Sequence, residues 1–389
     1  MTRVGSSKTI FFPNLNGVRA IAAMMVVIHH VEQTKAMFAL PSSYRSSLLG
    51  ELGVTLFFVL SGFLITYLLL VEKHDLGTIS LRAFYARRIL RIWPLYYLII
   101  VLAFFIVPTF FPTLLIGMRG LGEQLHKDFG TKLAMYIFFV PNVMLAMPLK
   151  YSLVPFASHL WSVGAEEQFY LIWPLLIKSF YRLPAILVSI VGFFLCLHSL
   201  LTTVRSASLD DRTRMAIDVV TNYLSMTRID CMAIGGLAAW LIFTQSPSLN
   251  VLYSKPLQLV LYLVTITMIY RDVPISFVGY LPYAILFALI ILNLAGNQRT
   301  ILTLNSTPLD YAGKVSYGLY MYHPLMIVIA IRFVGSHMAR YSATANIMFY
   351  ACSIGLAGVV SVLSYELFEK PCLRLKSRFS PITTGDNAH

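Results

Sequence analysis

The sequence predicts an all-α protein, a polytopic transmembrane helical bundle of about ten spanning helices plus one re-entrant or short segment. Hydrophobic residues make up 58% of the 389 residues and charged residues only 12%, and the mean hydropathy is +0.73. A soluble protein of this length would carry about twice that charged fraction. No polar linker separates the apolar runs. We therefore expect one transmembrane domain over residues 15–370, between a tail at 1–14 and a basic tail at 371–389.

Ten apolar runs approach the ~20 residues that a helix needs to cross a bilayer. They cover residues 15–31, 53–71, 92–111, 160–177, 183–201, 222–243, 256–270, 275–294, 315–334 and 345–364. A further run, Leu133–Met147, is short for a span and is broken by Pro141–Asn142. If this run enters the membrane and returns, the basic loop Lys73–Arg91 and the basic C-terminal tail both lie on the cytoplasmic side, as the positive-inside bias favours. We therefore expect a re-entrant segment and two cytoplasmic termini.

The formal charge of +13 is concentrated in a few loops and does not form a continuous stripe. This distribution indicates membrane topology and contact with anionic lipids, and we expect no nucleic acid partner. The four cysteines are scattered singly without the spacing of a metal site, so we expect no metal. The stretch Thr202–Thr221 is polar and is expected to be a loop.

The first apolar run, LNGVRAIAAMMVVIHHV, carries Arg19 near one end and His29–His30 at the other. Arg19 and His30 are eleven residues apart, so they share one helix face within roughly 20° and are separated by about 16 Å. His29 points about 100° away. An ionisable side chain at mid-bilayer depth is a functional hypothesis by default. The alternative, a histidine that only satisfies packing through a hydrogen bond, stays open on the sequence alone.

Arg88 and Arg91, in FYARRILRIWPL, are three residues apart and lie on one helix face. At a cytoplasmic membrane edge such a pair suits phosphate binding, because each guanidinium can donate to two oxygens. The same pattern is more often only an anchor for positive-inside orientation.

Other polar side chains interrupt later apolar runs. Glu166 and Tyr170, in HLWSVGAEEQFYLIWP, stack one helical turn apart, and a carboxylate entering an apolar run is expected to face a partner or water. His323, in VSYGLYMYHPL, is a second intramembrane histidine that is equally compatible with a packing role. Arg228 and Asp230, in TRIDCMAIGG, are expected to form an internal ion pair.

Together these segments resemble the membrane-bound acyltransferase family 3, the O-acetylases of lipopolysaccharide, exopolysaccharide and related glycans. The resemblance covers about 15–374 and rests on runs that occur in the family's order and spacing. These are LNGVRAIAAMMVVIHH, TLFFVLSGFLI, YARRILRIWPLYYL, HLWSVGAEEQFYLIWPLL, TRIDCMAIGGL, VSYGLYMYHPL and SYELFEKPCLRL. One departure is Asn16, where the family usually has aspartate, so a charged partner for Arg19 is expected to be missing there.

The family's motifs map onto particular residues of this chain. Its Arg-x10-His pair falls on Arg19 and His30, and its Arg-x-x-Arg pair falls on Arg88 and Arg91. Its Trp-Ser…Glu-x-Gln-Phe-Tyr element falls on Trp161, Ser162, Glu166, Gln168, Phe169 and Tyr170. The resemblance implies a multi-pass protein of the bacterial cytoplasmic (inner) membrane.

The resemblance further implies that an acyl group moves from cytoplasmic acyl-CoA, most simply acetyl-CoA, to a hydroxyl of a cell-surface or lipid-linked glycan. Acetyl-CoA would be a donor substrate and not a permanently bound cofactor. Arg88 and Arg91 would hold the CoA phosphates, and we assign Ser61, Tyr170 and His323 to the donor site as well.

The implied catalytic residues are His30, Arg19 and Glu166. His30 would act as the general base on the acceptor hydroxyl or would itself take the acyl group, since imidazole titrates near neutral pH. Arg19 would stabilise an oxyanion or hold a phosphate. Glu166 would orient the histidine or bind sugar hydroxyls.

Two alternatives remain on sequence grounds. One is a secondary transporter in which His30, Glu166 and His323 form a proton relay, although no internal repeat is visible. The other is acylation of a glycosylated small molecule instead of a surface glycan.

Overall fold

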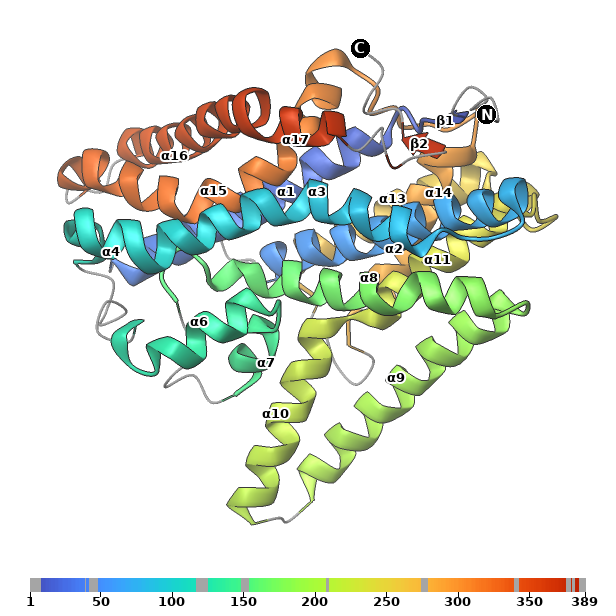
Figure 1. Cartoon of the computed structure of the whole chain (residues 1–389), viewed down its shortest axis with the longest axis horizontal. Helices are drawn as coiled ribbons and strands as arrows, with labels where there is room; N and C mark the ends of the chain where they lie inside the picture. The colour runs from blue at the N-terminus through green and yellow to red at the C-terminus, as the bar shows by residue number, and fades with distance from the viewer. Residues whose placement is uncertain are drawn as a thin grey trace.

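The computed structural model is a bundle of long helices with one short two-stranded sheet (Figure 1). It describes residues 8–38, 40–41, 48–116, 125–147, 154–207, 210–273, 279–338, 343–375, 379 and 382–384. Its long helices are α1 (Leu15–Met37), α2 (Leu49–Leu76), α3 (Leu81–Val101), α8 (Trp161–Ser179), α9 (Leu183–Ser206), α10 (Asp211–Thr227), α11 (Ile229–Phe243), α13 (Lys255–Tyr270), α14 (Leu281–Gly296), α15 (Thr307–Met338) and α16 (Ala343–Ser364). The predicted all-α helical bundle is confirmed.

Six helical stretches within the described residues have the length and hydropathy of a membrane span. They are Leu49–Leu76, Leu81–Phe110, Leu183–Ser206, Asp211–Phe243, Ser316–Val334 and Ala343–Leu375. The helices α13 and α14 are shorter but also apolar. Helices α1 and α8 fall outside both groups, and they carry Arg19, His30 and Glu166 of the candidate site.

Helix α2 lies at the centre of the bundle, with α1 packed against one side and α11 against another, while α15 packs between α1 and α16. Two glycines allow α2 and α11 to cross closely. A Cβ on Gly62 would lie 2.0 Å from the carbonyl oxygen of Met232, and one on Gly235 would lie 2.0 Å from that of Val59. Gly62 and Gly235 therefore act as small residues that let the two helix backbones approach.

The expected span 222–243 is not one continuous helix. Arg228 has a left-handed backbone conformation with φ of 46°, which ends α10 and begins α11 at an angle to it. This bend brings the Arg228 side chain into the bundle, where it is 3% exposed.

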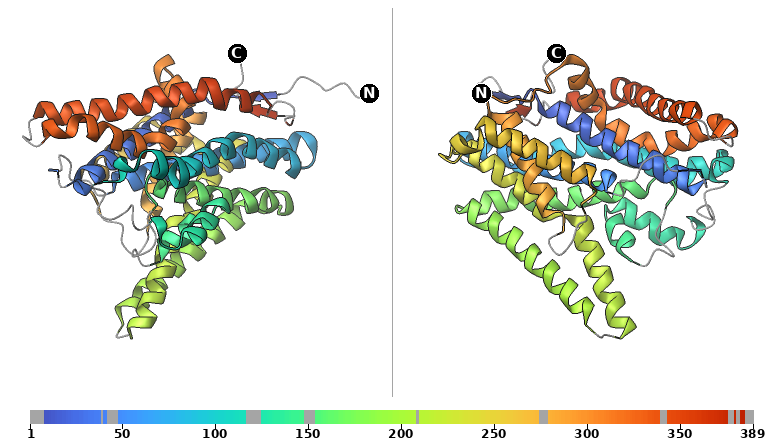
Figure 2. Two further views of the ribbon diagram at one scale, coloured as in Figure 1. Left: turned by 60° about the vertical axis from the view of Figure 1, so that its left-hand side comes forward. Right: turned by 180° about the vertical axis from the view of Figure 1, so that it is seen from behind.

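The expectation of a loop over Thr202–Thr221 is wrong. Helix α9 continues to Ser206 and α10 already begins at Asp211, so polar residues extend both helices. Asp210 caps α10, because its Oδ1 accepts a hydrogen bond from the Thr213 backbone nitrogen at 3.0 Å. The far ends of α9 and α10 diverge from the other helices in every view (Figures 1 and 2).

The run Leu133–Met147 forms two short helices, α6 (Phe129–Ile137) and α7 (Pro141–Ala146), with a turn between them. Gln168 on α8 fastens this turn. Its Nε2 donates to the carbonyl oxygen of Phe139 at 2.9 Å and to Asn142 Oδ1 at 2.8 Å, and Asn142 Nδ2 donates back to Gln168 Oε1 at 3.1 Å. The break at Pro141 agrees with the short segment expected here.

The first and the last described strands lie together at one end of the bundle (Figure 1). Strand β1 (Lys8–Ile10) pairs in parallel with β2 (Ile382–Thr384). The last helical stretch continues through a π-helical turn into α17 (Lys370–Leu375), so helix extends past residue 370.

Candidate functional site

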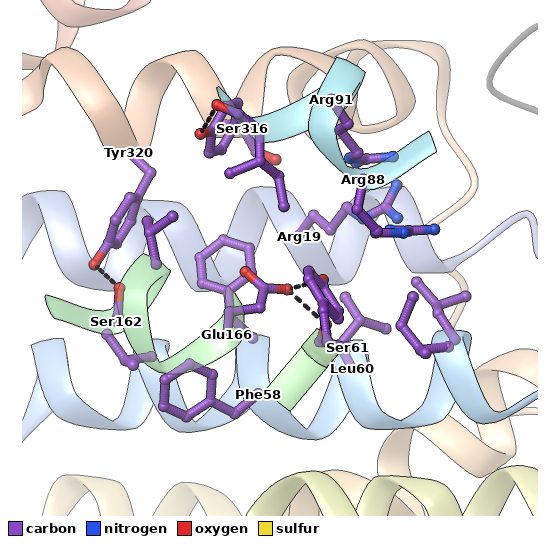
Figure 3. Close-up of a pocket in the computed structure, with 18 of the residues that line it drawn as sticks. Arg19, Phe58, Leu60, Ser61, Arg88, Arg91, Ser162, Glu166, Ser316 and Tyr320 are labelled. Atoms are coloured by element: carbon purple, nitrogen blue, oxygen red, sulfur yellow. Dashed lines mark hydrogen bonds between the residues drawn. The ribbon is translucent and has the colours of Figure 1, made fainter. Parts of the chain in front are cut away.

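A cavity of about 120 Å³ lies between α1, α2, α3, α8 and α15, and we call it the arginine cavity. Its polar lining residues are Arg19, Ser61, Arg88, Arg91, Ser162, Glu166, Tyr170, Ser316, Tyr317 and Tyr320. The three arginines gather at one end, and Tyr320 with Ser162 lies at the other (Figure 3). Six of the eight site residues predicted from the sequence therefore share this cavity, and the two that do not are His30 and His323.

Helix α3 presents its arginines in two directions. Arg87 points away from the cavity and is buried against Glu72, with its guanidinium 3.1 Å from the carboxylate. Arg88 lines the cavity, where its guanidinium lies 5.4 Å from the centre of the Tyr170 ring. Among the described residues the Arg88 Nε atom has no hydrogen-bond partner, although it is buried. A half-buried guanidinium whose buried Nε donor is unused favours an anionic ligand at this end.

Arg19 reaches the same end of the cavity from α1, held by a relay of side chains. Its NH1 donates to Asn16 Oδ1 at 2.8 Å, and Asn16 Nδ2 donates to Asp310 Oδ1, also at 2.8 Å. Asp310 in turn forms an ion pair with Lys314 at 2.8 Å. Position 16 thus offers Arg19 a neutral amide oxygen in place of a charged partner, as expected, and the same amide contacts the carboxylate of Asp310 on α15.

Glu166 lies midway along the cavity and accepts hydrogen bonds at Oε1 from Ser61 Oγ, at 2.6 Å, and from the Tyr170 hydroxyl. The two hydroxyls also contact each other at 2.8 Å. Glu166 thus binds hydroxyl groups, and of its two expected roles the orientation of His30 is not realised in this structure. The i, i+4 stacking predicted for Glu166 and Tyr170 is confirmed.

Three histidines from separate segments form a cluster beyond the far end of the arginine cavity. The ring centroids of His30 and His323 are 4.8 Å apart, and those of His323 and His159 are 5.1 Å apart. His159 was not predicted as a site residue, although it lies only two residues before Trp161 of the Trp161–Ser162 motif. His323 belongs to this cluster and not to the donor-binding lining expected for it.

Backbone carbonyl groups fix the ring orientation of two of these histidines. His30 Nδ1 lies 2.9 Å from the carbonyl oxygen of Val26, and His323 Nδ1 lies 2.7 Å from that of Tyr320. A carbonyl oxygen can only accept, so Nδ1 is the donor in both rings. The Nε2 atom of each neutral ring is therefore left with a lone pair, which is the arrangement that a general base or nucleophile requires.

A second cavity, of about 400 Å³, opens on the other side of this cluster, and we call it the histidine cavity. It is lined by His29, His30, Gln33, Gly50, Glu51, Val54, His159, Trp161, Asn222, Ser225, Met226, Arg228, Tyr280 and Tyr320. Amide, carboxylate, imidazole and aromatic groups alternate around it. This mixture suits a ligand with many hydroxyl groups.

In the histidine cavity, the guanidinium of Arg228 is bound by groups of the protein itself. Its NH2 lies 3.2 Å from the Glu51 carboxylate, and its NH1 donates to Thr55 Oγ1 at 2.7 Å. Its guanidinium also lies 3.5 Å from the centre of the Tyr280 ring. The expectation of an Arg228–Asp230 ion pair is wrong, since the left-handed turn at Arg228 directs its side chain toward α2.

Among the described residues, only Val54 and Tyr320 line both cavities. Arg19 and His30 share a helix, as predicted, yet Arg19 opens into the arginine cavity and His30 into the histidine cavity. The single site expected from the sequence is thus two compartments that meet at Tyr320.

A helical bundle that places a cationic cavity back to back with a histidine-lined cavity has the features of a membrane-embedded group-transfer enzyme. The chain matches the family described as "Acyltransferase domain" over residues 12–366, and it belongs to that family. The resemblance to the membrane-bound acyltransferases drawn from its motifs is confirmed, and the chain is a multi-pass membrane protein.

Relatives are named as O-acetyltransferases. The chain is similar to the peptidoglycan O-acetyltransferase OatA of Listeria monocytogenes, with 24% identity over 93% of this chain and 56% of the relative. It is 29% identical to O-acetyltransferase OatA of Staphylococcus aureus strain NCTC 8325, over 93% of this chain and 57% of the relative. A putative O-acetyltransferase of Staphylococcus aureus strain COL is 28% identical over 94% of this chain and 58% of its own length. The chain thus spans little more than half of each relative, and no solved structure matches it.

Proposed function

We propose that this protein is a membrane O-acetyltransferase that moves an acetyl group from acetyl-CoA to a hydroxyl of a cell-surface or lipid-linked glycan. The observation that carries the proposal is the meeting of two cavities at Tyr320, one lined by arginines and the other by histidines. The relatives are named as O-acetyltransferases, which supports acetyl as the transferred group. The peptidoglycan enzyme of Listeria supports a glycan acceptor.

The arginine cavity is the proposed donor site. Arg19, Arg88 and Arg91 would bind the phosphates of acetyl-CoA at one end, which gives Arg19 a phosphate-binding role in preference to an oxyanion-binding role. The wall between this end and Tyr320 is largely apolar and is supplied by α2, with Phe57, Phe58, Leu60, Leu64, Ile65 and Leu68. Such a wall suits the pantetheine arm, whose amide groups would meet Ser61 and Tyr170 on the way to the histidines.

The histidine cavity is the proposed acceptor site, and His30 is its reactive group. In one route His30 Nε2 takes the proton of the acceptor hydroxyl while the hydroxyl oxygen attacks the thioester carbon. The carbon–sulfur bond then breaks, and the CoA sulfur leaves as a thiol after taking up the proton. In the other route Nε2 attacks the thioester carbon first, the carbon–sulfur bond breaks and CoA leaves as the thiolate. The acetyl group then passes from Nε2 to the acceptor oxygen, and the proton of the acceptor hydroxyl goes to the CoA thiolate.

The proposed orientation places the arginine end of the bundle and both termini in the cytoplasm, in the inner membrane of a bacterium, in contact with membrane lipids. The pairing of β1 with β2 supports a common side for the two termini. Reporter fusions after Val71 and Arg374 are expected to read cytoplasmic, and one after Ala207 is expected to read periplasmic. A periplasmic reading after Arg374 would contradict this topology.

The transporter alternative gains no support from the described contacts. Its relay would require Glu166 to exchange protons with His30 and His323, but the Glu166 Oε1 hydrogen bonds go to Ser61 and Tyr170 in the other cavity. A glycosylated small molecule would suit the histidine cavity as well as a surface glycan does. The assay below distinguishes the two acceptors.

The test is transfer of radiolabel from acetyl-labelled acetyl-CoA by membranes that contain the protein. The acceptors are peptidoglycan fragments, lipid-linked oligosaccharides and glycosylated small molecules, offered separately. We expect base-labile labelled ester on a glycan with the wild-type protein and none with membranes lacking it. Labelling of only the small molecules would show that the acceptor is a glycosylated small molecule and not a surface glycan. No transfer to any acceptor would contradict the proposed function.

A further inference from the structure

Tyr320 on α15 lies where the two cavities meet, and within the described part of the chain the only other residue that lines both is Val54 on α2. We propose that Tyr320 and Val54 form a constriction that admits an acetyl group from the donor side but holds back longer acyl chains and the water of the acceptor side. Tyr320 would then determine which acyl-CoA is used and would couple its consumption to transfer. This inference rests on the proposed function.

The Tyr320 side chain is held in place at its hydroxyl end. Its hydroxyl donates to the backbone carbonyl oxygen of His159 at 2.9 Å and lies 2.6 Å from Ser162 Oγ. A tyrosine hydroxyl has one proton, so with that proton on the His159 carbonyl the Ser162 hydroxyl donates to Tyr320. Two hydrogen bonds thus tie the tip of the ring, from α15, to the start of α8.

The ring is also packed on its faces and edges. Its centroid lies 6.0 Å from that of Phe57, 5.4 Å from that of His159 and 5.7 Å from that of His323. The residue is only 6% exposed. A side chain that is fixed at its tip and enclosed along its length keeps one position, as a size filter must. Figure 3 places it at the end of the arginine cavity opposite the arginines.

A constriction at this place has a chemical purpose. The thioester carbonyl of acetyl-CoA must reach past Tyr320 to approach His30, whose cavity is open enough to hold water. Water that met the thioester would attack its carbonyl carbon, break the carbon–sulfur bond and yield acetate and the CoA thiol with the proton of the water. Filling the passage with an anchored aromatic ring reduces this wasteful reaction.

The experiment compares Tyr320→Ala with Tyr322→Ala in the purified full-length protein. Tyr322 is a matched control, because it lies on the same helix, is 7% exposed, and donates its hydroxyl hydrogen bond to Ser364 away from both cavities. Transfer to the acceptor and release of CoA thiol are measured with acetyl-, butyryl- and hexanoyl-CoA. Thiol release is also measured without acceptor.

Tyr320→Ala is expected to raise the butyryl-to-acetyl ratio of transfer by about tenfold or more, the scale on which apolar pockets discriminate added methylenes. It is also expected to raise the ratio of thiol release without acceptor to transfer with acceptor. Tyr322→Ala should leave the butyryl-to-acetyl ratio and this release-to-transfer ratio at their wild-type values. Tyr320→Phe, which keeps the ring, should retain the preference for acetyl. Ratios are independent of how much protein folds.

Val54→Ala widens the same constriction from α2 with a smaller loss of packing, so it tests the proposal if Tyr320→Ala does not fold. The proposal is overturned if neither variant changes the acyl preference or acceptor-independent thiol release while the wild-type protein transfers acetyl groups. It is equally overturned if Tyr322→Ala shifts both ratios as much as Tyr320→Ala. A wild-type protein that transfers no acyl group from any CoA ester contradicts the proposed function itself.

Discussion

The two cavities each contain arginine, but the protein uses its guanidinium groups differently in the two places. In the histidine cavity Arg228 is satisfied by Glu51 and Thr55 and is covered by the Tyr280 ring. In the arginine cavity Arg88 lies over Tyr170 with its buried Nε atom unpartnered among the described residues. The difference teaches that a buried arginine is a structural group where the protein supplies its acceptors, and a ligand-binding group where it does not.

The largest expected effect is the loss of acetyl transfer on removal of His30, the proposed reactive group of the histidine cavity. His30→Ala should lower acetyl transfer by about 10²–10⁴-fold as the loss of a general base, and by more if His30 carries the acetyl group. The measurement is transfer of labelled acetyl groups to the acceptor at equal membrane abundance. Trapping of acetyl-histidine at position 30 without acceptor would select the covalent route.

His29→Ala is the matched control for this variant. His29 also lines the histidine cavity, but its ring packs against α2 beside Gly50, where an added Cβ would lie 2.5 Å from the ring. Its variant should keep most of the transfer activity. A dead His29→Ala with an active His30→Ala would show that the wrong histidine has been assigned to the chemistry.

The second effect belongs to the arginine cavity. Arg88→Ala and Arg91→Ala should each raise the KM for acetyl-CoA by about 10- to 150-fold, because each removes a charge-assisted contact worth about 1.5–3 kcal/mol. Lysine at either position should rescue only partly, since it keeps the charge but loses the planar fork.

Arg82→Ala is the control for charge alone, because Arg82 is exposed in the first turn of the same helix and lies outside the cavity. An equal rise in KM for Arg82→Ala would show that Arg88 and Arg91 do not bind the donor directly. They would then act only by general electrostatic attraction or as an anchor for membrane topology.

Removing the arginine of the histidine cavity should have a different consequence. Arg228→Ala leaves the Thr55 hydroxyl and nearby backbone carbonyl groups without their donor, which should cost about 1–3 kcal/mol in the free energy of unfolding. The side chain of Glu51 is 45% exposed and regains water, which limits the loss. The thermal midpoint should fall while the KM for acetyl-CoA stays near the wild-type value. A raised KM with an unchanged midpoint would break the comparison between the two arginines.

The smallest effect is expected at the relay behind Arg19. Asn16→Asp replaces the amide that donates to Asp310 with a second carboxylate, so the link from Arg19 to α15 should be lost. The expected cost is about 0.5–1.5 kcal/mol in the free energy of acetyl-CoA binding, seen as a raised KM for acetyl-CoA. Adding Asp310→Asn reverses the roles of donor and acceptor and should restore the KM for acetyl-CoA. A double variant no better than Asn16→Asp would show that the relay does not position Arg19.

The sequence predicted the all-α helical bundle because the length of an apolar run is a local property of the chain. Helix patterning likewise identified the shared faces of Arg88 with Arg91 and of Glu166 with Tyr170. What failed depended on contacts between distant segments. The partner of Arg228 is set by a left-handed turn that has no signal in composition. Asp310, which accepts the hydrogen bond of the Asn16 amide, lies 294 residues away from it in the sequence.

The division into two cavities was also beyond sequence reasoning. Helical periodicity places Arg19 and His30 on one face, but it contains no information about a side chain on α15 that comes between them. His159 went unrecognised for the same reason. A single histidine in a short segment gains meaning only when His30 and His323 arrive beside it from other helices.

The central claim is that the arginine cavity binds the donor and the histidine cavity performs transfer. Equilibrium binding of radiolabelled acetyl-CoA to purified His30→Ala and to the Arg88→Ala, Arg91→Ala double variant tests it most directly. The account predicts that His30→Ala binds acetyl-CoA as tightly as the wild-type protein yet transfers no acetyl group, while the double variant loses binding. Unimpaired binding by the double variant, or loss of binding in His30→Ala, would contradict it.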